Sequence, residues 1–339
     1  MSVSIGIGVI GCGQWGPNHI RNFSHLPGSR VLMCADLNSA RLRAMQECFR
    51  GVRGTSDYRD VLRNPQIDAV VVATPTASHY RLVKESLLSG KDVLCEKPLC
   101  LNPEEAQELI SVAKKRRRIL MVGHVFLYNA GIRMLKDLLD RRQCGRVYYL
   151  HSERTNLGPF RSDVNAVWDL ASHDVAVFNY LLGGMPLEVS ARGGKYLQKQ
   201  LEDVAFVSMV YPRGVLVNIH VSWLDPRKVR QITLVADKQM VIWDDLDMVG
   251  PIKIYNRRVV KESFYETFGE FHLLAKEGDI TIPKVELCEP LKKQALHFLE
   301  CIHSRCRPLT DGTESFRGIQ VLSAIQKSLS RKGSPVSVG

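Results

Sequence analysis

The first 124 residues alternate between continuous apolar runs and segments in which apolar residues recur with helical spacing. The runs at residues 3–10, 29–36, 67–75, 91–98 and 119–124 predict buried strands, and the segments between them predict helices. Single helices between buried strands are typical of a doubly wound parallel sheet. We therefore expect residues 1–124 to form a Rossmann domain.

The pattern changes after about residue 125, where strands with alternating polarity begin to dominate. Helices are predicted at residues 129–142, 166–184, 289–305 and 314–331, and strands at residues 145–156, 187–197, 203–214, 215–226, 230–245 and 251–256. Successive strands joined by tight turns indicate an antiparallel sheet. We expect residues 125–339 to form an α/β domain whose open, largely antiparallel sheet carries helices on one face.

The second face of this sheet is expected to be rich in Val, Ile, Met and Trp. Such a face would be exposed unless another subunit covered it. The sequence therefore predicts a homodimer or homotetramer formed through the C-terminal sheet.

A glycine-rich turn follows the first predicted strand. Gly11, Gly13 and Gly16 match the G-x-G-x-x-G pattern, and the turn, which also contains Gln14 and Trp15, opens a helix. Gly11 would permit the tight turn, Gly13 would let a pyrophosphate approach the backbone, and Gly16 would let the helix pack on the strand. The helix N-terminus would supply amide donors to the phosphates.

Asp36 ends the second predicted strand, 20 residues after Gly16. A carboxylate there accepts hydrogen bonds from the adenosine ribose hydroxyls and repels a 2′-phosphate. Leu37 and Asn38 follow it and offer no Arg for such a phosphate, which favours NAD over NADP. The alternative is a plain strand-to-helix turn in which Asp36 only caps the strand end.

Polar residues also follow two later strands, where ligands of such sheets bind. Thr74 and Pro75 end one strand, and His79 either faces the cofactor or is an ordinary residue of the next helix. Glu96 and Lys97 end another strand, where charges are costly unless they are paired or used. Lys97 could hydrogen-bond a substrate hydroxyl beside the nicotinamide, and the alternative is a surface ion pair between Glu96 and Lys97.

A carboxylate and an imidazole lie four residues apart in the predicted helix at residues 166–184. Asp169 and His173 would share one helix face. Histidine titrates near neutral pH, so this pair could act as an acid and base. The alternative is that His173 is a core histidine with no chemical role.

Charge and cysteine content narrow the classes of function. The net charge of +11 suits anionic small molecules, and the basic run at residues 114–118 lies at a predicted helix end, where its charges complement the helix dipole. We expect no nucleic-acid partner, although a dedicated basic patch is the alternative.

The nine cysteines include no Cys-x-x-Cys pair, so we expect reduced thiols and no metal site. No long apolar run or signal peptide is evident, which predicts a cytoplasmic protein outside the membrane.

The segments "GVIGCGQWG", "ATPTASH", "CEKPL" and "WDLASHD", in this order, resemble those of the Gfo/Idh/MocA family of NAD(P)-dependent sugar oxidoreductases. The resemblance covers nearly the whole chain and implies that Lys97 contacts the reacting hydroxyl, that His173 is the acid/base and that Asp169 lies in the substrate site. It also implies that Glu96, Lys97 and the glycine turn bind NAD, and that His124 lies at the substrate. Ser172 stands where the family often has Gly.

The segment at residues 154–174 resembles the branch of this family that acts on nucleotide-linked amino sugars, especially UDP-N-acetylglucosamine 3-dehydrogenases. This resemblance implies that Arg154, Asn156 and Arg161 contact the substrate, with Arg suited to a diphosphate. The implied product is a 3-keto nucleotide sugar, which an aminotransferase would convert to a 3-amino sugar for a surface glycolipid of the lipid A type. The alternatives are another sugar or polyol dehydrogenase, for instance for an inositol, and a non-catalytic NAD-binding regulator.

Overall fold

The computed structural model of this protein describes residues 4–263, 271–276 and 278–339. The chain forms two compact units, one made of Met1–Tyr128 and Cys288–Ser323 and the other of Asn129–Leu287 and Ala324–Gly339. The sequence-based division at residue 124 does not include the return of residues 288–323 to the first unit.

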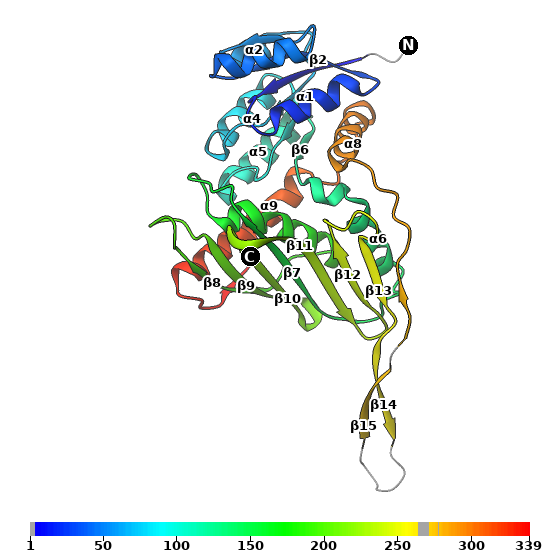
Figure 1. Cartoon of the computed structure of the whole chain (residues 1–339). Helices are drawn as coiled ribbons and strands as arrows, with labels where there is room; N and C mark the ends of the chain where they lie inside the picture. The colour runs from blue at the N-terminus through cyan, green and yellow to red at the C-terminus, as the bar shows by residue number, and fades with distance from the viewer. Residues whose placement is uncertain (1–3, 264–270, 277) are drawn as a thin grey trace. The chain divides into compact units, whose positions relative to one another are not determined.

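The first unit contains a six-stranded sheet in the order β3-β2-β1-β4-β5-β6, and all of its strand pairs are parallel (Figure 1). Its strands are β1 (Ile5–Ile10), β2 (Ser29–Ala35), β3 (Arg53–Thr55), β4 (Ala69–Val72), β5 (Asp92–Cys95) and β6 (Leu120–Val122). The strand order changes direction at β1, which lies between β2 and β4. This is the doubly wound topology expected from the sequence, and its ligands bind outside the carboxyl ends of the strands.

The helices of the first unit are α1 (Gly16–His25), α2 (Ser39–Cys48), α3 (Tyr58–Arg63), α4 (His79–Leu88), α5 (Pro103–Arg116) and, from the later part of the chain, α8 (Pro290–Ser304), with short 3-10 turns η1 (Thr76–Ser78) and η2 (Val125–Tyr128). Their starts follow sequence signals for helix capping. The Asn38 side chain accepts backbone hydrogen bonds at the start of α2, and Asn102 does so before Pro103 of α5.

Helix α8 completes the core of the first unit. Phe298 is fully buried, and its ring contacts the Phe23 ring of α1 edge-to-face, with 6.3 Å between centroids. Ala295, Leu299 and Ile302 of the same helix belong to the same buried cluster. The apolar face of α8 therefore packs with a segment more than 260 residues earlier, a pairing that helical periodicity alone does not reveal.

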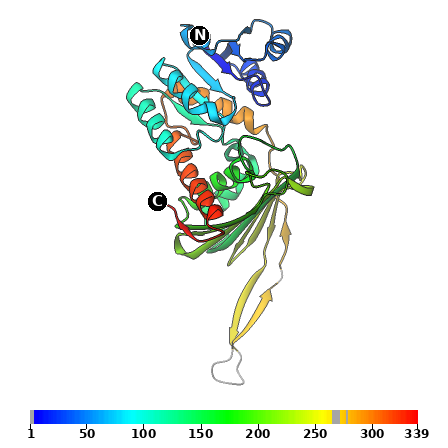
Figure 2. The ribbon, with the colours of Figure 1, turned by 90° about the vertical axis from the view of Figure 1, so that its left-hand side faces the viewer.

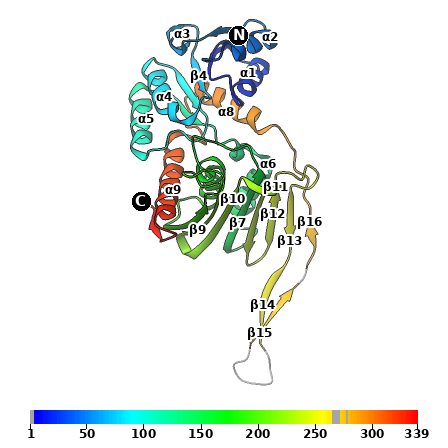
Figure 3. The ribbon, with the colours of Figure 1, turned by 60° about the vertical axis from the view of Figure 1, so that its left-hand side comes forward.

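The second unit contains a nine-stranded sheet in the order β16-β13-β12-β11-β7-β10-β9-β8-β17. Its strands are β7 (Val147–Leu157), β8 (Glu188–Gly194), β9 (Val204–Tyr211), β10 (Val215–Ser222), β11 (Leu224–Ala236), β12 (Met240–Asp244), β13 (Ile252–Tyr255), β16 (Ile280–Thr281) and β17 (Val336–Ser337). Strands β7 and β10 pair in parallel and the other neighbours pair antiparallel, as the prediction of a largely antiparallel sheet required. Strands β14 (Arg258–Ser263) and β15 (Phe271–Lys276) form a separate antiparallel pair that extends beyond β13 (Figure 3).

Helices α6 (Ala130–Asp140), α7 (Ser172–Leu182) and the end of α9 (Gly312–Ser330) lie on one face of this sheet, and no helix of the described residues lies on the opposite face (Figure 2). The sequence predicts a second face rich in Val, Ile, Met and Trp, but Trp223 and Trp243 of this unit are each only 1% exposed. Cross-strand neighbours Phe206 and His220 are side by side on the open face with their rings stacked at 4.4 Å. The open face therefore includes a phenylalanine and a histidine in addition to the residue types expected there.

No helix in the described part of the chain combines the length and apolar character needed to cross a bilayer.

Replacing Phe298 with Ala is expected to lower the free energy of unfolding by about 3–5 kcal/mol, the usual cost of removing a buried aromatic ring. The matched control is Leu296→Ala, on the exposed side of the same helix. This control should change the free energy of unfolding by no more than about 0.5 kcal/mol. Urea unfolding followed by circular dichroism measures both variants, and equal effects would contradict the assignment of α8 to this core.

Candidate active site

The glycine turn after β1 is shaped by two close approaches of the backbone. Gly11 has a φ of +98°, and a Cβ there would lie 2.5 Å from the carbonyl oxygen of Ala73. A Cβ on Gly16 would overlap the carbonyl oxygen of Gly11. At Gly13, by contrast, the nearest atom to an added Cβ is Arg41 Nη1 at 3.7 Å. The three positions therefore match the roles expected for them, with open space at the position where a pyrophosphate would approach.

The N-terminus of α1 adjoins the glycine turn. Trp15 is the N-cap residue, no side chain among the described residues caps the helix, and its first turn contains no acidic residue. The Gln14 carbonyl accepts a hydrogen bond from Asn18 Nδ2 at 3.2 Å, which fixes the turn. An uncapped helix N-terminus beside a glycine turn is a suitable site for an anionic phosphate group.

Asp36 connects the end of β2 to the glycine turn. Its carboxylate accepts hydrogen bonds from the backbone N–H of Cys12 at 2.7 Å and of Asn38 at 2.8 Å. Arg41 Nη1 lies 3.7 Å from Asp36 Oδ2. The sequence argument considered only Leu37 and Asn38, and it missed that the first turn of α2 brings Arg41 back to the carboxylate. Asp36 remains the acidic residue expected at the ribose position.

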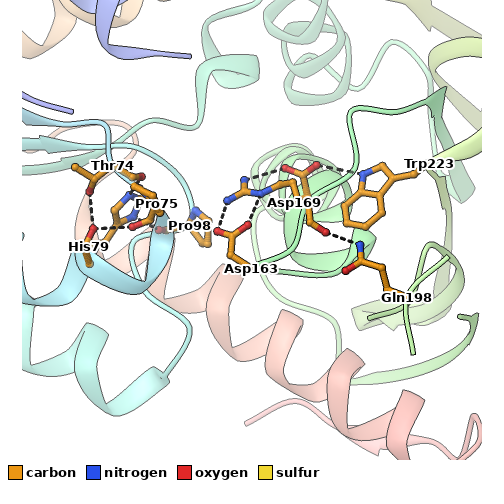
Figure 4. A network of polar contacts seen from close by, with 10 residues as sticks. Thr74, Pro75, His79, Pro98, Asp163, Asp169, Gln198 and Trp223 are labelled. Carbon is orange, nitrogen blue, oxygen red and sulfur yellow. Dashed lines mark hydrogen bonds and ion pairs between the residues drawn. The ribbon is translucent and has the colours of Figure 1, made fainter. Parts of the chain in front are cut away.

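The turn after β4 is held by His79 (Figure 4). The two ring nitrogens of His79 each lie 2.8 Å from a carbonyl oxygen, Nε2 from that of Thr74 and Nδ1 from that of Pro98. Ser78 Oγ donates to Thr74 Oγ1 at 2.8 Å. His79 is 1% exposed. It therefore joins the turns that follow β4 and β5, and Thr74 and Pro75 belong to the same arrangement.

Glu96 follows β5 and is buried beside a histidine of α1. His19 Nε2 lies 2.7 Å from Glu96 Oε1. Burial by itself would raise the pKa of Glu96, but the hydrogen bond and electrostatic interaction with His19, together with the positive charge of Lys97, outweigh it and lower this pKa. Glu96 thus pairs with His19 inside the unit, which differs from the surface ion pair with Lys97 that the sequence left open.

Lys97 and His124 lie at the ends of neighbouring strands. Lys97 directly follows Glu96, whose Oε2 accepts the Lys97 backbone N–H at 3.3 Å, and the Lys97–Pro98 peptide is cis. His124 follows β6 and is buried, and neither ring nitrogen has a hydrogen-bond partner among the described residues. Burial, assisted by the charge of Lys97, lowers the pKa of His124 to about 4. His124 is therefore a neutral imidazole with unused hydrogen-bonding capacity at the ligand-binding edge of the sheet.

In the second unit, Asp169 lies on a π-helical turn, η3 (Val167–Ala171), and His173 lies in the first turn of α7. Single π-helical turns are frequent at functional sites. Asp169 accepts hydrogen bonds from Arg161 Nη1 at 3.2 Å and from Trp223 Nε1 at 3.3 Å (Figure 4). The sequence predicts one regular α-helix through Asp169 and His173, whereas in the structure Asp169 lies on a wider π-helical turn that leads into α7.

Arg161 is held by several neighbours. It makes two hydrogen bonds to the carboxylate of Asp163, at 2.9 and 2.6 Å, and its carbonyl accepts Gln198 Nε2 at 2.7 Å (Figure 4). The hydrogen bond to Asp163 raises the pKa of Arg161. With carboxylates of both Asp163 and Asp169 beside it, Arg161 is better arranged to orient Asp169 than to present an unshared charge to a diphosphate.

Arg154 differs from expectation. Its guanidinium donates to both carboxylate oxygens of Asp174, at 2.9 and 3.0 Å, and the two side chains are almost completely buried. A buried pair of this kind fixes β7 to α7, the helix that carries His173, and removing one partner leaves an unpaired buried charge. The geometry argues against Arg154 as a diphosphate contact. Asn156 Nδ2 donates to the carbonyl oxygen of Gly158.

Sequence reasoning missed three residues that hold the expected ones in place: His19, Arg41 and Trp223. Helical spacing places His19 one turn after Gly16, and a search for polar residues on the inner face of α1 would have found it. No local signal links Trp223 to Asp169, because the contact joins residues 54 positions apart. No group of three or more His, Cys, Asp or Glu side chains in the described ranges is arranged to hold a metal ion.

Two family models match this chain. The model described as "Oxidoreductase family, NAD-binding Rossmann fold" matches residues 5–124, and the model of the GFO/IDH/MocA C-terminal domain matches residues 132–242. An inositol 2-dehydrogenase of Gluconacetobacter diazotrophicus is 30% identical over 227 residues, which cover 65% of this chain and 67% of the relative.

Two solved structures share the fold over nearly the whole chain. UDP-N-acetylglucosamine 3-dehydrogenase GnnA from Acidithiobacillus ferrooxidans has a TM-score of 0.79 at 23% identity and covers 97% of this chain and 99% of its own. The WlbA dehydrogenase from Bordetella pertussis, solved with NADH and UDP-GlcNAcA, has a TM-score of 0.80 at 22% identity and covers 99% of both chains.

The fold and the glycine turn define an oxidoreductase with an NAD-binding Rossmann domain. In particular, the chain belongs to the Gfo/Idh/MocA family, as its sequence resemblance implied.

The position of Arg41 beside Asp36 predicts how cofactor choice would change. Asp36→Ala removes the carboxylate that repels a 2′-phosphate and should narrow the preference for NADH over NADPH. Arg41 then remains to attract the phosphate. The double variant Asp36→Ala/Arg41→Ala should bind NADPH about tenfold more weakly than Asp36→Ala does. This factor corresponds to roughly 1.5 kcal/mol, the contribution of a hydrogen bond to a charged group.

Calorimetric titration of the purified variants with NADH and NADPH measures these affinities without turnover. Arg43→Ala, on the same helix, is the control for a general loss of positive charge. Equal affinities of the unmutated protein for the two cofactors would contradict the role of Asp36.

Proposed function

We propose that this protein oxidises the 3-hydroxyl of a nucleotide-linked amino sugar, with UDP-N-acetylglucosamine as the best candidate, to the 3-keto sugar. The observation that carries this proposal is the buried pair of His19 and Glu96, which fixes the start of the Lys97 turn at the ligand-binding edge of an NAD-binding domain. The likeness of the whole chain to two nucleotide-sugar enzymes supports the substrate class.

The cofactor is assigned to the first unit. The open space at Gly13, the uncapped start of α1 with Gln14 and Trp15, and Asp36 fit a dinucleotide, and Gly11 and Gly16 shape the turn. NAD, when bound, accepts the hydride. Thr74, Pro75 and His79 form the turn after β4 and would line the cofactor site, with His79 holding the turn through its two carbonyl contacts.

Lys97 and His173 have different roles at the reacting hydroxyl. The ammonium of Lys97 stabilises negative charge that develops on the oxygen, and His173 takes the hydroxyl proton. Glu96 stays ionised beside His19 and supports the positive charge of Lys97. His124, which is neutral and has unused ring nitrogens, accepts or donates one hydrogen bond to the sugar.

Asp169 binds the sugar beside His173. Arg161 and Trp223 hold its carboxylate from two sides, so the carboxylate has a defined orientation. In this proposal Arg161 acts mainly as a positioning residue for Asp169, Asn156 contacts the substrate from β7, and Arg154 positions α7. The remaining basic charge of the chain favours an anionic substrate.

An inositol or another polyol is the second candidate substrate. The relative that is 30% identical is an inositol 2-dehydrogenase, and the same Lys, His and Asp chemistry would serve a secondary hydroxyl of either compound. The partial neutralisation of Arg161 by Asp163 and Asp169 also favours this alternative, because it weakens the argument for a diphosphate contact.

Further proposals concern partners and location. A 3-keto nucleotide sugar is a substrate for an aminotransferase, which would act next in forming a 3-amino sugar for a glycolipid, and we place the reaction in the cytoplasm. The helix-free face of the nine-stranded sheet, with exposed Tyr149, Phe206 and Leu216, is proposed as the surface of a homodimer or homotetramer.

Lys97→Met and His173→Asn are each expected to reduce turnover by about 100-fold or more, the scale of a positioned proton-transfer or charge-stabilising group. Binding of NADH, measured by fluorescence, should remain nearly unchanged. Lys115→Met and His303→Asn alter exposed residues outside the proposed site and serve as matched controls. Full turnover in either site variant would remove that residue from the mechanism.

Substrate class is tested by comparing UDP-N-acetylglucosamine, free N-acetylglucosamine and myo-inositol while following NADH absorbance and product mass. The UDP-linked sugar should give by far the highest kcat/KM, because binding of the remote nucleotide positions the reacting carbon. Increasing salt should raise KM for this substrate through charge screening. A higher kcat/KM with myo-inositol would instead assign the protein to the polyol dehydrogenases of the family.

A further inference from the structure

Two cysteines meet at the C-terminal end of α8. Cys306 Sγ lies 3.4 Å from Cys301 Sγ. The contact follows from the way the helix ends, because Arg305 adopts a left-handed conformation with φ 55° and ψ 25°. A left-handed residue at a helix end reverses the chain and brings the next side chain over the last turn. The spacing of five residues therefore produces a thiol pair only because the helix stops between them.

The two thiols have different surroundings. Cys306 is exposed, whereas Cys301 is buried. Burial and the hydrogen bond with Cys306 raise the pKa of Cys301 to about 12. His297 Nε2 lies 3.5 Å from Cys301 Sγ. An oxidant from solution can thus reach Cys306, and the neighbouring buried thiol of Cys301 stays protonated.

The backbone on both sides of the pair is anchored. The apolar side chains of α8 pack in the core of the first unit, and Arg305 Nη1 binds both carboxylate oxygens of Asp92 at 2.9 Å. Beyond Cys306, the carbonyl oxygen of Thr310 accepts the backbone N–H of Val122 at 2.8 Å. These contacts hold the thiols together, and a bond of about 2.05 Å between the sulfurs requires only a small local shift.

We infer that Cys306 and Cys301 form a reversible oxidation site for hydrogen peroxide, a modification independent of the dehydrogenase reaction. The Cys306 thiolate attacks one peroxide oxygen, so that an S–O bond forms, the O–O bond breaks and hydroxide leaves with a proton as water. The Cys301 sulfur then attacks the sulfenic sulfur of Cys306. The S–S bond forms, the S–O bond breaks, and the departing hydroxide takes the Cys301 proton as a second water. A dithiol reductant restores both thiols.

The other cysteines provide internal controls. Cys48 and Cys288 are exposed, and neither has a hydrogen-bonded thiol partner in the part of the chain that the structure describes. Cys12 and Cys34 are close to each other, but both are buried. Exposure combined with a neighbouring thiol thus distinguishes Cys306 from the other exposed cysteines.

The experiment exposes the reduced full-length protein to hydrogen peroxide, unfolds it in denaturant so that N-ethylmaleimide blocks all remaining thiols, and maps the peptides by mass spectrometry. The expected product lacks the mass of two hydrogen atoms, joins the peptides of Cys301 and Cys306, and disappears after treatment with dithiothreitol. Cys306→Ser should lose this product, whereas Cys48→Ser should retain it. In Cys301→Ser, Cys306 should accumulate as a sulfenic acid that dimedone traps.

Circular dichroism of each variant establishes that it is folded before oxidation. Three results would overturn the inference: a Cys301 that stays available to N-ethylmaleimide, a disulfide that joins two chains instead of these two residues, or equal dimedone labelling of Cys48, Cys288 and Cys306. Loss of dehydrogenase activity is not a readout, so failure here and failure of the proposed reaction are separate.

Discussion

The first unit depends on the close approach of α1 to the turn after β1. Because a side chain at Gly16 would overlap the carbonyl oxygen of Gly11, the helix can lie this near the strand only without a Cβ at that point. This approach fixes where α1 runs. One turn later the same helix places His19 against Glu96, the residue before Lys97. The position of a proposed catalytic lysine thus follows from a glycine more than 80 residues earlier.

In the second unit, hydrogen-bonded charged side chains position the helix that carries His173. The buried pair of Arg154 and Asp174 ties β7 to α7, and Arg161 with Trp223 holds Asp169 on the π-helical turn before that helix. Arg154 donates two hydrogen bonds to Asp174, and the carboxylate of Asp169 accepts one hydrogen bond from Arg161 and one from Trp223. Charges buried in this way cost little only when their partners stay in place, so they also limit how the helix can move.

The return of α8 to the first unit connects the late part of the chain to the early part. Its apolar face supplies Phe298 to a core that residues of α1 begin, while its end is fastened to Asp92 at the start of β5. The same anchoring keeps Cys301 and Cys306 in contact. The sequence pattern predicts only an amphipathic helix here. In the structure this segment contributes core side chains, the ion pair with Asp92 and the contact between the two thiols.

The sequence by itself determined the doubly wound sheet, the glycine turn, Asp36 at the end of β2 and the family. These features depend on local spacing and on the side chains of single strands and helices, which a sequence pattern contains. Tertiary structure alone decided that Glu96 pairs with His19, that Arg41 returns to Asp36, that Arg154 is buried against Asp174 and that residues 288–323 join the first unit. The π-helical turn under Asp169 also required the structure. Apart from that turn and Arg41, each of these contacts joins residues from distant parts of the chain, and the burial that makes a charge costly or useful exists only after the chain has folded.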